Sequence, residues 1–78
     1  MKYTKKEFGH GLMTEINKGY EPTRIARWAF ARLMDPDNRI DGKELHDLIL
    51  TVVAMEEGPE FEYSEQDLRE LANRLAEA

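Results

Sequence analysis

Apolar residues recur along the chain at the spacing of amphipathic helices, in segments separated by glycine and proline. In the first segment Thr4 and Glu7 fit a capping box, in which a threonine oxygen and a glutamate carboxylate satisfy free backbone N–H groups. Gly19 is suited to end this helix. The stripe expected to be buried between these ends consists of Phe8, Leu12 and Ile16. Gly9 and Gly11 weaken the helix by about 1 kcal/mol each relative to alanine, which predicts fraying or close packing on a neighbour.

A second helix is predicted to begin at Pro22, whose missing N–H costs nothing in a first helical turn. It is expected to end at Asp35, because Pro36 disfavours the helical conformation of the residue before it. The apolar face of this helix is expected to contain Ile25, Ala26, Ala29, Phe30 and Leu33.

The third helix is predicted to follow a capping signal formed by Asp41 and Glu44 and to end at Gly58. Its inward face is expected to contain Leu45, Leu48, Ile49, Val52 and Met55. Leu50, Val53 and Ala54 extend the apolar surface almost around the helix. This pattern predicts a central helix that the other three contact.

The fourth helix is predicted to be capped by Ser64, with Asp67 in its first turn. Its apolar stripe consists of Leu68, Leu71, Ala72 and Leu75. Phe61 and Tyr63, in the segment before it, are expected to plug the core, although periodicity alone does not decide their burial or that of Trp28. Residues 1–78 are therefore predicted to form one all-α domain, a compact bundle of four short helices.

Composition narrows the possible functions. With 41% hydrophobic and 35% charged residues and no cysteine, the 78-residue chain has the composition of a folded protein that needs neither disulfides nor thiolate metal sites. Its longest apolar run is far shorter than the roughly 20 residues that cross a membrane, and the first residues lack the apolar core of a secretory signal. We therefore expect a cytoplasmic protein.

No catalytic, metal or cofactor signature is present. Calcium-loop registers beginning at Asp35 or Asp37 both fail to supply the required ligands, so this segment is predicted to be a turn followed by a helix cap. His10 and His46 lack the nearby companions of a zinc site, and Ser64 has no glycine-rich elbow around it. We therefore expect a binding protein that is not an enzyme and has no cofactor.

Charge is unevenly distributed along the chain, whose formal net charge is -5. Residues 1–34 contain seven Lys/Arg and three acids, or +4, whereas residues 35–78 contain four Lys/Arg and thirteen acids, or -9. The stretch from Glu56 to Glu70 holds seven acids opposed only by Arg69. Such a segment repels nucleic acid and attracts a basic protein surface, although acids also serve simply to keep a small protein soluble.

Nucleic-acid binding is a weaker alternative, which would use an arginine-rich face with an aromatic residue. It would require the third helix to act as the recognition helix of a helix-turn-helix, yet Lys43 is the only basic residue at its start. The residues that would bind nucleic acid are Arg24, Arg27, Trp28 and Arg32.

The segment from Met55 to Glu65 combines acids, two aromatic residues and a proline, which is typical of a protein-binding surface with a charged rim and apolar anchors. We predict that carboxylates complement the charge of a partner and that an aromatic side chain anchors it. The candidate partner-binding residues are Glu56, Glu57, Glu60, Phe61, Glu62, Tyr63, Asp67 and Glu70.

Together with Glu15–Pro22 and Arg24–Ala29, this segment resembles small bacterial immunity proteins that accompany the polymorphic toxins of contact-dependent growth inhibition systems. The resemblance extends over most of the chain and implies a protein that binds and blocks a cognate toxin domain, often a nuclease with a basic active site. The main rival is a small acidic adaptor for another cytoplasmic protein, in which Phe61 and Tyr63 belong to the core and the acids only maintain solubility.

Overall fold

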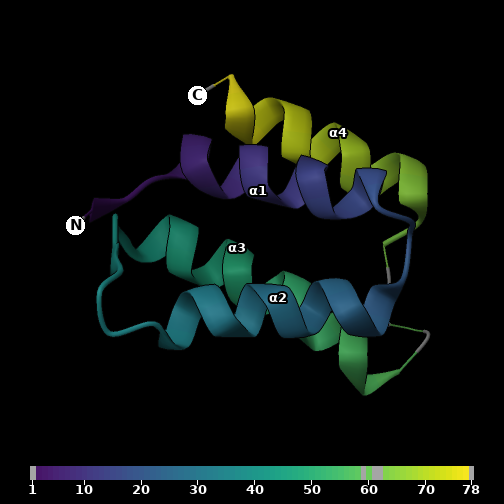
Figure 1. Cartoon of the computed structure of the whole chain (residues 1–78), viewed down its shortest axis with the longest axis horizontal. Coiled ribbons are helices and arrows are strands. Elements are labelled where there is room, and N and C mark those ends of the chain that lie inside the picture. The colour runs from purple at the N-terminus through teal and green to yellow at the C-terminus, as the bar shows by residue number, and fades with distance from the viewer. Residues whose placement is uncertain (1, 59, 61–62, 78) are drawn as a thin grey trace.

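The computed structural model describes residues 2–58, 60 and 63–77, and its α-helices confirm the predicted all-α bundle (Figure 1). The four helices are α1 (Lys5–Asn17), α2 (Pro22–Met34), α3 (Lys43–Val53) and α4 (Glu65–Ala76). A short 3-10 helix, η1 (Ala54–Glu57), continues α3, and two-residue strands form β1 (Lys2–Tyr3) and β2 (Arg39–Ile40). The radius of gyration is 11.4 Å, close to the roughly 11.5 Å expected of a compact chain of this length.

The helices pack as two layers, with α1 on α4 and α2 on α3 (Figure 1). The prediction that the other three helices contact α3 holds unevenly, because α3 packs chiefly on α2 and meets α1 through the Lys5–Glu44 ion pair and α4 through the hollow that Leu48 shares with Leu71. Leu50 is 42% exposed, so the apolar side chains that widen the surface of α3 do not all reach the core. The apolar residues that extend almost around α3 therefore include one, Leu50, that faces solvent instead of the core.

The expected stripes form most of the core. Their fully buried members come from all four helices and include Phe8, Leu12, Ile25, Ile49 and Leu68. Two expected core residues differ. Phe30 is 50% exposed, because a step of one residue beyond Ala29 turns the helix by about 100° and carries the side chain off the buried face. Leu48 is only half-buried.

Gly9 and Gly11 lie at close helix contacts, which confirms the close packing predicted for them. A Cβ atom on Gly9 would stand 2.4 Å from the backbone nitrogen of Ala76 and 2.8 Å from the carbonyl oxygen of Ala72. A Cβ atom on Gly11 would stand 2.6 Å from the ring of Trp28. The two glycines therefore allow α1 to approach α4 on one side and the indole of α2 on the other.

The helix caps follow the sequence at two of three predicted positions. Thr4 and Ser64 accept hydrogen bonds from the backbone N–H groups of Glu7 (3.2 Å) and Asp67 (3.1 Å). Asp41 does not cap α3, which instead begins after Gly42, a glycine with φ of +93°.

The difference at the start of α3 arises from the small sheet. β1 and β2 pair in parallel, with Tyr3 opposite Ile40, and the N–H of Asp41 donates to the carbonyl of Tyr3 at 3.0 Å. This pairing sets the direction of the chain just before α3, and the left-handed conformation of Gly42 then turns it into the helix. Two-residue strands are too short to give a periodic signal in the sequence.

The inner face of α3 gives a first test of the core. We expect Val52→Ala, at a fully buried position, to lower the free energy of unfolding by about 2 kcal/mol. Leu48→Ala should cost about half as much, because Leu48 lines a surface hollow with Leu71 and Leu75 and is already partly solvated. Thermal melts followed by circular dichroism would measure both, and unchanged melting temperatures would contradict the placement of α3.

Candidate protein-binding surface

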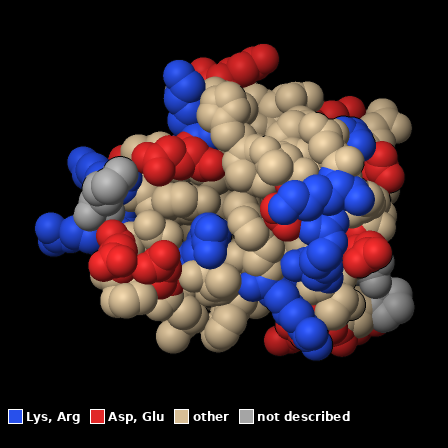
Figure 2. Space-filling model, viewed as in Figure 1, with Lys and Arg blue, Asp and Glu red and all other residues tan. Residues whose placement is uncertain are grey.

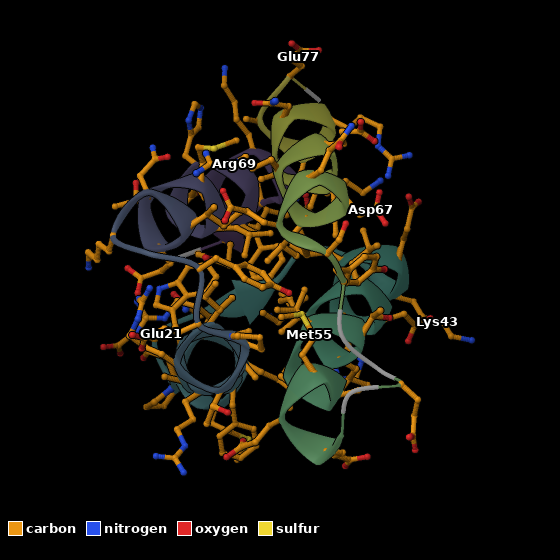
Figure 3. The ribbon with its side chains drawn as sticks, turned by 90° about the vertical axis from the view of Figure 1, so that its right-hand side faces the viewer. Glu21, Lys43, Met55, Asp67, Arg69 and Glu77 are labelled. Atoms are coloured by element: carbon orange, nitrogen blue, oxygen red, sulfur yellow. The ribbon has the colours of Figure 1, made fainter. Side chains whose placement is uncertain are left out.

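Five of the predicted partner-binding residues carry carboxylates that are described and exposed, and we call them the acidic end. They are Glu56, Glu57, Glu60, Asp67 and Glu70. Figure 3 looks onto the end of the molecule where η1 and the start of α4 lie, with Met55 and Asp67 both labelled there. η1 continues α3 to Glu57, and Ser64 caps α4 after the connecting segment. The chain reversal between α3 and α4 therefore gathers residues separated by up to 14 positions at one end.

Two acids of this region are paired within the chain. The Nε atom of Arg27 donates to Glu56 Oε1 at 3.0 Å, which ties η1 to α2. The Nε atom of Arg69 donates to Glu65 Oε2 at 3.1 Å, and its NH1 group donates to Asn17 Oδ1 at 2.9 Å, so Arg69 faces α1 (Figure 3). Because Arg69 is bound to Glu65 and Asn17, it does not pair with a carboxylate of the acidic end in the described structure.

The other acids have little or no internal compensation. Glu57, Glu60 and Asp67 are exposed, and their carboxylates make no ion pair within the described ranges. Glu70 accepts only a long hydrogen bond, 3.5 Å, from Gln66 Nε2. These carboxylates therefore keep their charge available to a partner.

The aromatic residues of the predicted site are only partly described. Phe61 and Glu62 lie outside the described residues. Tyr63 is half-buried and packs against the core, as expected of a plug, and its carbonyl accepts a hydrogen bond from the Tyr20 hydroxyl. A partner can thus reach only part of the Tyr63 side chain.

Folding partly neutralises the charge split between the two halves of the sequence. Three ion pairs join a base of the first half to an acid of the second, namely Lys2–Asp41, Lys5–Glu44 and Arg27–Glu56. Acidic and basic side chains are accordingly interspersed over the face shown in Figure 2. Of these three ion pairs, only Arg27–Glu56 involves a residue of the acidic end.

The arginines considered for nucleic acid have partners inside the protein. Arg24 NH1 donates to Glu15 Oε1 at 2.7 Å, and its NH2 group donates to the Glu15 carbonyl at 2.8 Å. The guanidinium of Arg32 lies 6.0 Å from the ring centroid of Trp28, and its Nε atom is buried without a hydrogen-bond partner in the described structure. These side chains brace α2 and do not present a continuous basic face. The sequence did not indicate that Glu15 is buried or that it binds Arg24.

Three aromatic side chains pack against one another inside the bundle. Phe8 stacks on Trp28 with ring centroids 5.3 Å apart and meets Tyr3 edge-on at 6.3 Å. Burial raises the pKa of Tyr3 to about 12, and the nearby positive charge of Arg32 only partly opposes this effect. The phenol therefore stays protonated at neutral pH, and its role is to pack.

Histidines and acids are the side chains that could hold a metal ion in this cysteine-free chain. Within the described ranges, no group of three or more of them is arranged to do so. His10 and His46 are both exposed, on α1 and α3. No described helix is long and apolar enough to cross a membrane.

No family model, curated protein or solved structure matches this chain. Its function is therefore inferred from its own residues, foremost the acidic end.

Proposed function

We propose that this protein is an immunity-type inhibitor, which binds and neutralises a toxin domain with a basic surface through the acidic end. The observation that carries the proposal is the exposure of Glu57, Glu60 and Asp67 without ion pairs in the described structure, beside Glu56 and Glu70. A carboxylate already paired with a neighbour would contribute less attraction to a partner than Glu57, Glu60 and Asp67, which have no such pair in the described structure.

A nuclease is the class of toxin that fits best. Its active site must attract phosphates and is therefore basic, so an inhibitor that presents carboxylates is drawn to the same face. Long-range attraction speeds the encounter, and carboxylates that become desolvated on contact then stabilise the complex. An inhibitor of this kind needs no catalytic group of its own.

The proposal is tested by comparing two variants, each of which reverses the charge of one exposed glutamate. Glu60→Lys and Glu77→Lys change the net charge equally, but only Glu60 belongs to the acidic end, whereas Glu77 follows the far end of α4. With a basic toxin domain encoded by the adjacent gene, we expect Glu60→Lys to slow association about tenfold at low salt. Glu77→Lys should change it less than twofold, and the difference should shrink as salt rises.

Stopped-flow or surface-plasmon kinetics at two salt concentrations would measure these rates, and survival of cells that co-express the toxin would report protection. Equal slowing by both reversals would contradict a localised acidic site. Binding without protection would favour the adaptor alternative. Failure to bind any basic domain, with nucleic acid retained during purification, would overturn the proposal.

A further inference from the structure

A second surface, on the outside of α2, meets the acidic end at the Arg27–Glu56 ion pair and is otherwise formed by different residues. Phe30 and Met34 are 50% and 62% exposed, and Ala31 between them is exposed as well. With Arg27 they follow the spacing i, i+3, i+4 and i+7, which places them along one side of the helix. We call Arg27, Phe30, Ala31 and Met34 the outer stripe.

The contacts of α2 fix the direction in which the outer stripe faces. Trp28 stacks on Phe8 and Arg24 binds Glu15, so that flank of α2 faces α1. Arg27 instead binds Glu56 of η1, and Ile25, Ala26 and Ala29 point into the core. The outer stripe therefore lies on the side of α2 turned away from α1, next to the seam with α3.

The helix across that seam adds apolar surface. In α3, Glu44 binds Lys5, and Leu48 shares a hollow with Leu71, so this flank faces α1 and α4. Leu50 is two residues, or about 200°, further around the helix, which places it on the opposite flank, toward α2. Leu50 is 42% exposed, so this flank of α3 also presents an apolar side chain to solvent.

Charges of opposite sign stand at the two ends of the outer stripe. Arg27 lies at its N-terminal end with 73% of its side chain exposed, and exposed Asp37 follows the C-terminal end in the turn after α2. Along the lower part of Figure 2, uncharged atoms lie between a group of acidic atoms on the left and a group of basic atoms, bordered by acidic ones, on the right. The outer stripe thus has an exposed arginine at one end, an apolar centre, and an exposed aspartate just beyond the other end.

Arg27 is also oriented in advance for a second carboxylate. Its Nε atom is held by Glu56 at 3.0 Å, while its two terminal nitrogens have no partner within the described part of the chain. A guanidinium fixed on one edge loses less conformational freedom when its other edge binds a carboxylate. The partner that fits the outer stripe therefore presents an apolar strip with an acid beside Arg27 and a base at the opposite end.

We propose that this partner is a second copy of the chain, docked with its α2 antiparallel to the first. A two-fold axis level with Arg32, midway between Arg27 and Asp37, places each Arg27 near Asp37 of the other copy and each Phe30 opposite Met34 of the other, because such an interface uses the same patch twice. From Arg27 to Asp37 the surface spans only about 15 Å, so the contact is small. Small interfaces are weak and transient, so we expect a dissociation constant on the order of 100 µM.

Sedimentation velocity from about 5 µM to 1 mM chain tests this. Wild type should shift from monomer toward dimer over that range, and Phe30→Ser should weaken self-association at least about tenfold. Glu77→Lys, away from the stripe, serves as the control and should self-associate like wild type. Circular dichroism would show that each variant folds, and Met34→Ser gives a second, more exposed position should Phe30→Ser unfold.

Charge exchange between chains supplies a sharper test. Arg27→Glu and Asp37→Lys should each be monomeric alone, because like charges then meet at both ends of the interface. An equimolar mixture should dimerise as wild type does, since the introduced glutamate then faces the introduced lysine at one end, while Arg27 still faces Asp37 at the other.

A wild type that stays monomeric to 1 mM, or a mixture that stays monomeric, would overturn the proposal. Loss of toxin binding by Phe30→Ser in a monomeric wild type would instead assign the stripe to the toxin.

Discussion

Gly9→Ala is expected to destabilise the protein, although the same replacement at an open helical position stabilises a helix by about 1 kcal/mol. The new methyl group would stand 2.4 Å from the nitrogen of Ala76 and 2.8 Å from two other backbone atoms of α4. Because backbone atoms cannot rotate aside, α1 and α4 would have to separate along their main contact. Overpacking of this kind costs about 1–3 kcal/mol, and we expect it to exceed the gain in helix propensity.

Urea unfolding followed by circular dichroism would measure this effect, with Gly11→Ala as the matched control. The Cβ atom of Gly11 meets the side chain of half-buried Trp28, which can shift more readily than a backbone. Gly9→Ala should therefore lower the unfolding midpoint more than Gly11→Ala. Gly9→Val, with a larger side chain, should leave little folded protein, since a domain of this size has only about 4–10 kcal/mol of stability. A higher midpoint for Gly9→Ala would contradict the close contact of α1 with α4.

Arg24→Ala is the second replacement with a large expected effect, a loss of about 2–3 kcal/mol. The Glu15 side chain is only 12% exposed, and Arg24 NH1 neutralises it at 2.7 Å. Arg24 NH2 also binds the carbonyl oxygens of Glu15 and Gly19, at 2.8 and 2.5 Å, near the end of α1. Removal of Arg24 leaves Glu15 to Lys18 alone, at 2.8 Å, and deprives both carbonyls of a charged donor. The expected loss is below that of a fully buried pair because Arg24 is itself 33% exposed.

The matched control is Arg27→Ala, which removes the same type of side chain from an exposed pair with Glu56 and should cost less than about 1 kcal/mol. Arg24→Lys should recover only part of the stability, because an ammonium cannot reproduce the planar arrangement of guanidinium donors. Chemical unfolding of the three variants would compare them. Equal losses for Arg24→Ala and Arg27→Ala would show that the Glu15 contact contributes nothing beyond a surface pair.

The acidic end was predicted in part by the sequence, through the density of acids between positions 56 and 70. The sequence did not reveal which of them are already paired. Glu56 is bound by an arginine 29 positions earlier, whereas Glu57, its neighbour, is not paired in the described structure. Such contacts depend on which helices become neighbours, which local patterns do not encode.

The sequence by itself determined the four helices and most of their buried sides. Phe8, Leu12 and Ile16 repeat at the period of one helical face, and Thr4 and Ser64 cap backbone groups only three residues away, so both features are local. Tertiary structure alone decided that α1 pairs with α4, that α4 is the neighbour on which Gly9 packs, and that Phe30 remains exposed. It also decided that Asp41 follows a strand instead of capping α3. Each of these depends on a partner distant in the sequence, and the periodicity of one helix carries no information about which neighbour will cover it.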